Sequence, residues 1–191
     1  MYRINSLILR GIVRMAKLQA IPLRGATSDG EVVEVREIDT HFLTQIAGWR
    51  HFNEVADRAL RTLSLFSPKD FRSPYRREGA TAWRIAPDRV LIRSFEKPDL
   101  ASSEDLVTLD LSDARVCLVI EGAGAAPLLS RVIALDFSEG SFPTGTFAQS
   151  ALHHVGVLVD RTGPEQFTLL IPTTWAVSLT DLLSHHLAKA A

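Results

Sequence analysis

The stretch that decides the fold is Arg115–Leu129, which reads RVCLVIEGAGAAPLL. Residues 115–121 are apolar at almost every position around Cys117, a pattern typical of a strand that is covered on both faces. Glycines at 122 and 124 then interrupt the strand, and apolar residues continue at helical spacing. Pro127 is compatible with a helix there because it falls in the first turn. We therefore expect a buried strand, a glycine turn and a short helix.

Further strands are predicted on both sides of this stretch. Their residues either alternate between apolar and polar or are β-branched and aromatic, and turn residues such as Gly163-Pro164 separate the strands. They are expected at Leu106–Leu111, Phe147–Leu152, Val155–Asp160 and Phe167–Ile171. An amphipathic helix with apolar residues between Trp175 and Leu187 closes the chain.

The first half of the chain repeats this order of elements. Glu31–Ile38 and His41–Ile46 are predicted strands, and residues 52–63 carry apolar side chains at the spacing of an amphipathic helix. Trp83–Ile85 and Val90–Phe95 flank a proline turn and form a predicted hairpin. The sequence thus predicts an α+β fold with duplicated antiparallel-sheet halves and helices, the halves spanning about residues 31–100 and 101–191.

Composition excludes several classes of function. The 21 basic residues nearly balance the 22 acidic ones, so the chain projects little field toward nucleic acid, and no nucleic-acid partner is expected. No apolar run approaches the roughly 20 residues that cross a bilayer, so no membrane role is expected. The single cysteine cannot form an internal disulfide, which favours a cytoplasmic location.

Residues 1–30 form a separate N-terminal segment in this interpretation. The part up to Arg24 is basic and contains no acidic residue. It lacks the uninterrupted apolar core of a signal peptide, because Arg10 lies within its apolar stretch. A disordered tail, a start codon placed too early with Met15 as the true beginning, and a transit-peptide or membrane-surface segment are the alternatives that the residues leave open.

No residue pattern predicts a catalytic, cofactor-binding or metal site in this chain. The pair Gly122 and Gly124 lacks the third glycine and the parallel βαβ context of a dinucleotide-binding loop. The histidine pairs are adjacent in sequence, and adjacent side chains point to different faces of a strand or helix. Cys117 lies in an apolar strand without an activating cation beside it, so a nucleophilic role is not expected.

The residues Ser64–Gly79 are the candidate partner interface. This connection is long and contains aromatic and arginine side chains, the types enriched at protein interfaces. The candidate interface residues are Phe66, Phe71, Arg72, Tyr75, Arg76 and Arg77. The alternative is a solvated loop whose aromatic side chains cover a sheet edge.

A series of short motifs supports a family resemblance. In the second half they run in order as Thr108–Asp113, Ile120–Ala125, Leu135–Phe137, Phe142–Gly145, Arg161–Phe167 and Leu170–Pro172. Looser matches lie at Gln45–Gly48 and Trp83–Asp88 in the first half. With these motifs the chain resembles the gamma subunit of bacterial heterotetrameric sarcosine oxidase from about Val32 to the C-terminus.

The resemblance implies a fold related to the folate-binding domain of the glycine-cleavage aminomethyltransferase. It also implies alpha, beta and delta partner subunits, with FAD, FMN, NAD and tetrahydrofolate held by subunits other than this one. Such a complex oxidises sarcosine to glycine and passes the one-carbon unit to tetrahydrofolate, and this chain would be a non-catalytic accessory subunit. Two alternatives stay open: a stand-alone folate-binding, aminomethyltransferase-like protein, and a self-associating domain of another role.

Overall fold

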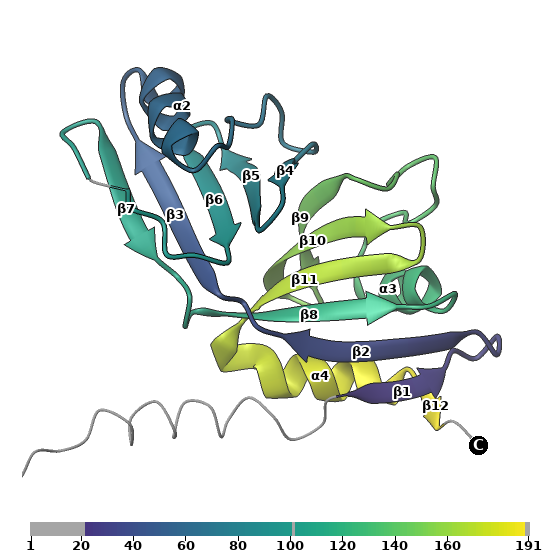
Figure 1. Cartoon of the computed structure of the whole chain (residues 1–191). Helices are drawn as coiled ribbons and strands as arrows, with labels where there is room; N and C mark the ends of the chain where they lie inside the picture. Colours follow the sequence, from purple (N-terminus) through teal and green to yellow (C-terminus); the bar gives the residue numbers. More distant parts are fainter. Residues whose placement is uncertain (1–21, 101, 190–191) are drawn as a thin grey trace, which may run out of the picture.

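The computed structural model describes residues 22–100 and 102–189 (Figure 1). In this part of the chain, twelve strands form two antiparallel sheets, one of seven strands and one of five. The two sheets diverge from a common junction, and helices cover the outer face of each (Figure 1). Within the described residues, no helix is both long and apolar enough to span a membrane.

The five-stranded sheet comes mainly from the first half of the chain. Its strand order is β4-β5-β6-β3-β7. The strands are β3 (Phe42–Gly48), β4 (Tyr75–Arg77), β5 (Ala80–Ala86), β6 (Arg89–Ser94) and β7 (Leu106–Asp110). Helix α2 (Phe52–Thr62) buries one stripe, including Phe52 and Leu60, against this sheet.

The seven-stranded sheet comes mainly from the second half, with the order β12-β1-β2-β8-β11-β10-β9. Its strands are β1 (Leu23–Ala26), β2 (Val32–Ile38), β8 (Arg115–Glu121), β9 (Phe147–Leu152), β10 (Val155–Gly163), β11 (Gln166–Pro172) and β12 (Ala188–Lys189). Helices α3 (Ala125–Val132) and α4 (Ala176–His185) cover its outer face, α4 following the 3₁₀ turn Thr173–Trp175.

The predicted duplication is confirmed by the strand order. Reading from the hairpin edge, β4-β5-β6-β3 in one sheet matches β9-β10-β11-β8 in the other. The next place in each sheet is taken by a strand from the other half: β7 pairs with β3, and β2 pairs with β8. Each half of the sequence, at about 31–100 and 101–191, therefore contributes one strand to the sheet that consists mainly of the other half.

A glycine admits the exchanged strand at the same place in each half. A Cβ at Gly48, at the end of β3, would lie 2.6 Å from the carbonyl oxygen of Asp105, just before β7. A Cβ at Gly122, directly after β8, would lie 2.5 Å from the carbonyl oxygen of Val32 in β2. Gly122 also has a φ of 111°, a conformation that residues with a side chain rarely adopt. The glycines thus permit the crossing that joins the halves.

Some elements were not anticipated from the sequence. β1 and β12 pair with each other at the edge of the larger sheet, and β4 lies inside the predicted irregular connection Ser64–Gly79. The final helix ends at His185, before the predicted limit at Leu187. Of the predicted N-terminal segment 1–30, residues 1–21 lie outside the described residues, whereas β1 makes its C-terminal part a strand.

Candidate functional site

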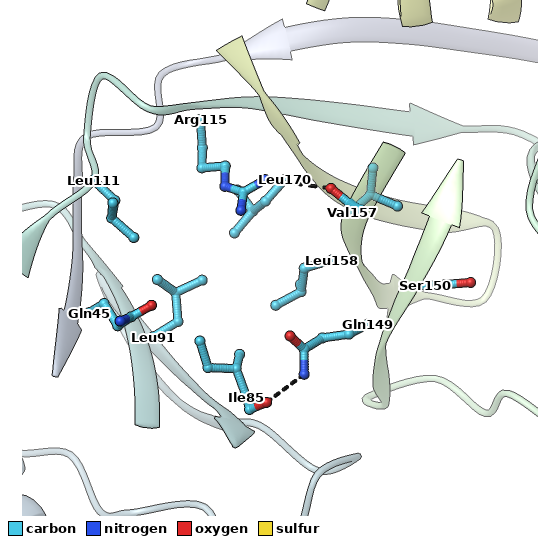
Figure 2. A pocket seen from close by; sticks show the side chains of 11 residues that line it. Gln45, Ile85, Leu91, Leu111, Arg115, Gln149, Ser150, Val157, Leu158 and Leu170 are labelled. Atoms are coloured by element: carbon cyan, nitrogen blue, oxygen red, sulfur yellow. Dashed lines mark hydrogen bonds between the residues drawn. The ribbon is translucent and has the colours of Figure 1, made fainter. Parts of the chain in front are cut away.

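A cavity of about 400 Å³ lies between the inner faces of the two sheets (Figure 2). Its walls are mostly aliphatic side chains, with two glutamine amides, one serine and one guanidinium among them. The lining residues are Gln45, Ile85, Leu91, Leu111, Arg115, Gln149, Ser150, Gly156, Val157, Leu158 and Leu170. Apolar walls with a few directed polar groups are typical of a binding cavity.

Two polar side chains in the cavity have defined contacts (Figure 2). The Gln149 side-chain amide donates a hydrogen bond of 2.6 Å to the carbonyl oxygen of Ile85 and so links the two sheets. Arg115 extends into the cavity from β8, and its Nη1 lies 3.5 Å from the carbonyl oxygen of Gly156. Burial lowers the pKa of Arg115 from its ordinary value.

The chemistry that these groups allow is binding rather than proton transfer. No carboxylate, histidine or thiol is among the described residues that line the cavity. Glutamine amides and a guanidinium orient a bound group but do not exchange protons near neutral pH. The cavity can therefore hold an apolar body with a polar or anionic end.

Deeper in the junction, Asp160 on β10 connects the sheets through two hydrogen bonds. Its side chain is fully buried. The Trp83 indole N–H on β5 donates to Oδ2 at 2.8 Å, and the Arg76 guanidinium on β4 pairs with Oδ1. A buried charge needs such partners to offset its desolvation. Asp160 thereby anchors the hairpin β4–β5 to the larger sheet.

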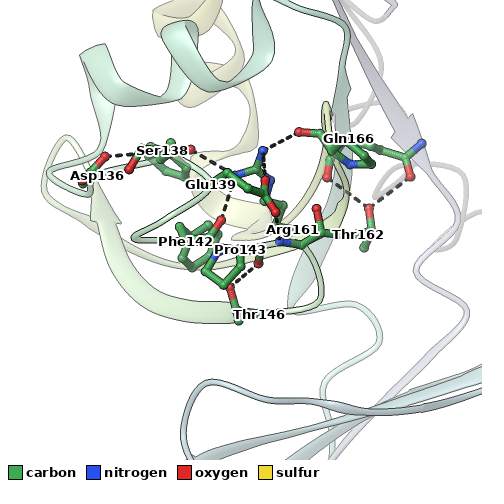
Figure 3. A network of polar contacts seen from close by, with 12 residues as sticks. Asp136, Ser138, Glu139, Phe142, Pro143, Thr146, Arg161, Thr162 and Gln166 are labelled. Carbon is green, nitrogen blue, oxygen red and sulfur yellow. Dashed lines mark hydrogen bonds and ion pairs between the residues drawn. The ribbon is translucent and has the colours of Figure 1, made fainter.

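The next residue, Arg161, organises a second buried network (Figure 3). Its guanidinium donates to the carbonyl oxygens of Phe142 at 2.8 Å, Phe137 at 3.1 Å and Pro164 at 2.5 Å. It also pairs with Glu139 at 2.7 Å. These contacts tie the long connection between α3 and β9 to the end of β10, so the residue has a structural role.

The predicted partner-interface residues do not all face outward. Arg72 donates from Nη2 to the carbonyl oxygen of Ser141 at 2.7 Å, and its own carbonyl accepts the N–H of Phe147 at 2.8 Å. Arg76 is paired with Asp160, as described above. These two arginines therefore hold the connection Ser64–Gly79 against the second half of the chain.

The other four predicted interface residues are more accessible. Phe66 is 51% exposed and makes an edge contact with the half-buried ring of Tyr75. Phe71 is 48% exposed, with the Arg84 guanidinium 5.7 Å from its ring centre. Arg77 is exposed on β4. Whether these side chains contact a partner stays a prediction.

The residues that the sequence analysis considered for chemistry are buried or form hydrogen bonds within the fold. Burial raises the pKa of Cys117 to about 11, so its thiol is protonated at neutral pH. The N–H groups of Gly122 and Gly124 donate to the carbonyl oxygens of Glu165 and Val32, which leaves neither for a phosphate. Among the described residues, no group of three or more potential ligands could hold a metal ion.

Asp160 and Arg161 were missed in the sequence analysis. A signal for them exists: they are an adjacent acid and base at the end of the otherwise apolar run Val155–Val159. Charged residues in such a strand are almost never buried unless they are paired. This signal could have identified a buried network, although not its partners.

Comparison with solved structures defines the fold class. The chain is similar to a chain of the heterotetrameric sarcosine oxidase from Corynebacterium sp. U-96, solved in complex with pyrrole 2-carboxylate. The match covers 100% of this chain and 98% of that chain, with a TM-score of 0.71 and 21% identity. Over 92% of its length this chain is similar to the glycine cleavage system aminomethyltransferase T from Bartonella henselae, with a TM-score of 0.54 and 15% identity. It spans 55% of that second chain.

The chain thus has an α+β fold of the aminomethyltransferase type, as predicted. The match to the sarcosine oxidase chain extends over nearly the whole of both chains. No protein-family model and no curated protein sequence matches the chain. At these identities the similarity concerns the fold, and function is argued separately.

Proposed function

We propose that this chain is a non-catalytic accessory subunit of a cytoplasmic sarcosine oxidase complex. The observation that carries the proposal is the end-to-end similarity to a chain of a heterotetrameric sarcosine oxidase, which covers 100% of this chain and 98% of the other. The aminomethyltransferase contains a further portion that this chain does not span. The near-complete coverage of both chains in the first match favours a subunit of that kind.

The interior of the chain supports the same proposal. Its fully buried carboxylate, Asp160, is held by Trp83 and Arg76, and the buried Arg161 is bound to backbone carbonyls. Catalytic acids and bases need perturbed groups that face a substrate-sized cavity. Here the buried charges instead join elements of the fold, which fits a subunit that acts by contact.

In this proposal the partners are alpha, beta and delta subunits, and FAD, FMN, NAD and tetrahydrofolate are held by subunits other than this one. The complex would oxidise sarcosine to glycine and transfer the one-carbon unit to tetrahydrofolate. The contribution of this chain would be to stabilise the assembly.

Co-expression tests the proposal. The chain, with an affinity tag, is produced together with alpha, beta and delta subunits encoded in the same genome, and the eluate is assayed for flavin absorbance and sarcosine oxidation. We expect all four chains to elute together in equal amounts, and the activity to lose stability when this chain is omitted. Elution of this chain alone, with unchanged oxidase activity and stability, would refute an accessory role.

The inter-sheet cavity favours a second candidate, a stand-alone folate-binding protein. Its aliphatic walls and side-chain amides would suit a planar ligand with polar edges. Titration calorimetry of the isolated chain with tetrahydrofolate tests this, with Gln149→Leu as the cavity variant. No heat at millimolar ligand, which corresponds to binding weaker than about −4 kcal/mol, would eliminate the candidate.

A further inference from the structure

An exposed apolar surface continues outward from the inter-sheet cavity along β7. Side chains two residues apart on a strand share a face, so Leu111, Leu109 and Val107 form one row. Leu111 lines the cavity, and Gln45, also in its lining, is the cross-strand partner of Leu109. Leu109 is 51% exposed and Val107 is 43% exposed. We call Arg115, Gln45 and these three apolar residues the inter-sheet groove.

The equivalent surface in the other half of the fold is charged. β2 occupies in the larger sheet the place that β7 occupies in the smaller one. On β2 the face opposite the buried Val33 and Val35 presents Glu34 and Arg36, which pair with Arg24 at 2.9 Å and with Glu121 at 3.4 Å. The fold therefore does not require an apolar face at this place, and the exposed Leu109 and Val107 need a separate explanation.

The inner end of the groove carries an unneutralised cation. The side chain of Arg115 points into the cavity, where its hydrogen bond to Gly156 is long at 3.5 Å (Figure 2). Among the described residues, no carboxylate lines the cavity, and Arg115 takes part in none of the ion pairs found between them. A half-buried guanidinium is stabilised by a bidentate carboxylate, which this part of the chain does not supply.

We propose that the inter-sheet groove receives an extended segment of a partner subunit, with apolar side chains against Leu109 and Val107 and an Asp or Glu carboxylate on Arg115. Two observations favour this occupant. The positive charge of Arg115 has no ion-pair partner among the described residues, and a carboxylate would complement it. The cavity is also continuous with an open row of apolar side chains on an edge strand. Extended segments suit such a site because their alternating side chains match the period of β7. The inference rests on the proposed function and names the surface that serves it.

The experiment compares assembly of matched variants with the alpha, beta and delta subunits. Arg115→Gln and Leu109→Asp alter the groove. The controls are Arg58→Gln, on the exposed side of α2, and Val177→Asp, on α4, whose side chain is 49% exposed. Circular dichroism and the midpoint of thermal unfolding establish that each isolated variant is folded. The dissociation constant for assembly is then measured by sedimentation of the purified complex over a dilution series.

We expect the dissociation constant to rise about thirtyfold or more for Arg115→Gln, because the carboxylate of the partner stays buried without its cation. Leu109→Asp should weaken assembly at least about tenfold, since it places a charge in an apolar contact. Arg115→Lys should recover part of the loss, because it keeps the charge but not the two parallel hydrogen bonds. The two controls should stay within about threefold of the wild type, as expected for surface positions outside the contact.

Each other outcome overturns the inference. If the wild type assembles and both groove variants assemble equally well, the groove is not the docking surface, although the proposed function stands. If the wild-type chain does not assemble at all, the proposed function fails and the inference fails with it. If Leu109→Asp abolishes only self-association of the isolated chain, the occupant is a second copy. If Arg115→Gln removes only tetrahydrofolate binding, the groove is a ligand site instead.

Discussion

Neutralising the buried Asp160 should destabilise the protein less than removing its partly exposed partner Arg76. The Asp160 side chain is fully buried, whereas the Arg76 side chain is 34% exposed. In Arg76→Gln the carboxylate stays buried with only the Trp83 N–H as a strong donor, and losing one partner of a buried pair costs about 3–5 kcal/mol. In Asp160→Asn the guanidinium can turn to water and the amide oxygen still accepts from Trp83. The amide N–H groups lack an acceptor, so we expect a cost of about 1–3 kcal/mol, below that of Arg76→Gln.

Urea unfolding of the isolated chain at neutral pH, followed by tryptophan fluorescence and circular dichroism, measures both free energies of unfolding. Arg77→Gln, at the neighbouring exposed position on β4, should change the free energy by less than about 0.5 kcal/mol and serves as the control. Two results would contradict the reasoning: a cost for Asp160→Asn that equals or exceeds that of Arg76→Gln, or costs below about 1 kcal/mol for both.

Three further predictions concern other features of the fold. Gly122→Ala should cost more than about 2 kcal/mol, because its φ is 111° and its Cβ would meet a β2 carbonyl oxygen at 2.5 Å, whereas Gly140→Ala, with open space around it, should be nearly neutral by the same urea assay. Cys117, with its pKa raised to about 11, should not react with a thiol reagent in the native protein at pH 8 and should react fully in denaturant. Hydrogen bonds from the side chains of Gln166 and Arg36 lower the pKa of Glu121 below its ordinary 4.5. Its contribution to stability is therefore present above that pH and is lost as the pH falls through the lower folded value. The urea midpoint of Glu121→Gln should fall less than that of the wild type between about pH 5 and pH 3.

The local elements of the fold were predictable from the sequence because their signals are local. The buried strand, glycine turn and short helix of Arg115–Leu129 occur as β8, Gly122–Gly124 and α3. The hairpins around Ala86-Pro87-Asp88 and Gly163-Pro164 occur as β5–β6 and β10–β11. In each case a run of hydrophobic residues with a defined period ends at a residue that forces a turn.

The exchange of β2 and β7 between the sheets was not predictable in the same way. Pairing of β2 with β8, and of β3 with β7, joins residues that are distant in the sequence, and no local pattern specifies such a pairing. The two glycines that permit it, Gly48 and Gly122, look like ordinary turn residues until the neighbouring backbone is known. The short strands β1 and β12 depend on the same long-range edge and carry little signal of their own.

The candidate partner interface shows the same limit for side chains. Arginines and aromatic residues on the long connection Ser64–Gly79 indicated a contact surface, but composition does not reveal which molecule is contacted. Arg72 and Arg76 contact the second half of their own chain, because Ser141 and Asp160 offer acceptors there. Phe66 and Phe71 keep about half of their surface exposed on the same connection.

The exchanged strands bear directly on how this fold could serve a complex. Because of the exchange, two short connections, 39–41 and 111–114, join the sheets, and Asp160, Gln149 and the side chains packed between the sheets link the two walls of the groove. A partner segment bound between them would meet a surface that is already ordered, and binding would then cost little conformational entropy on this side. In the proposed role of an accessory subunit, such an ordered groove would fix the position of a neighbouring chain.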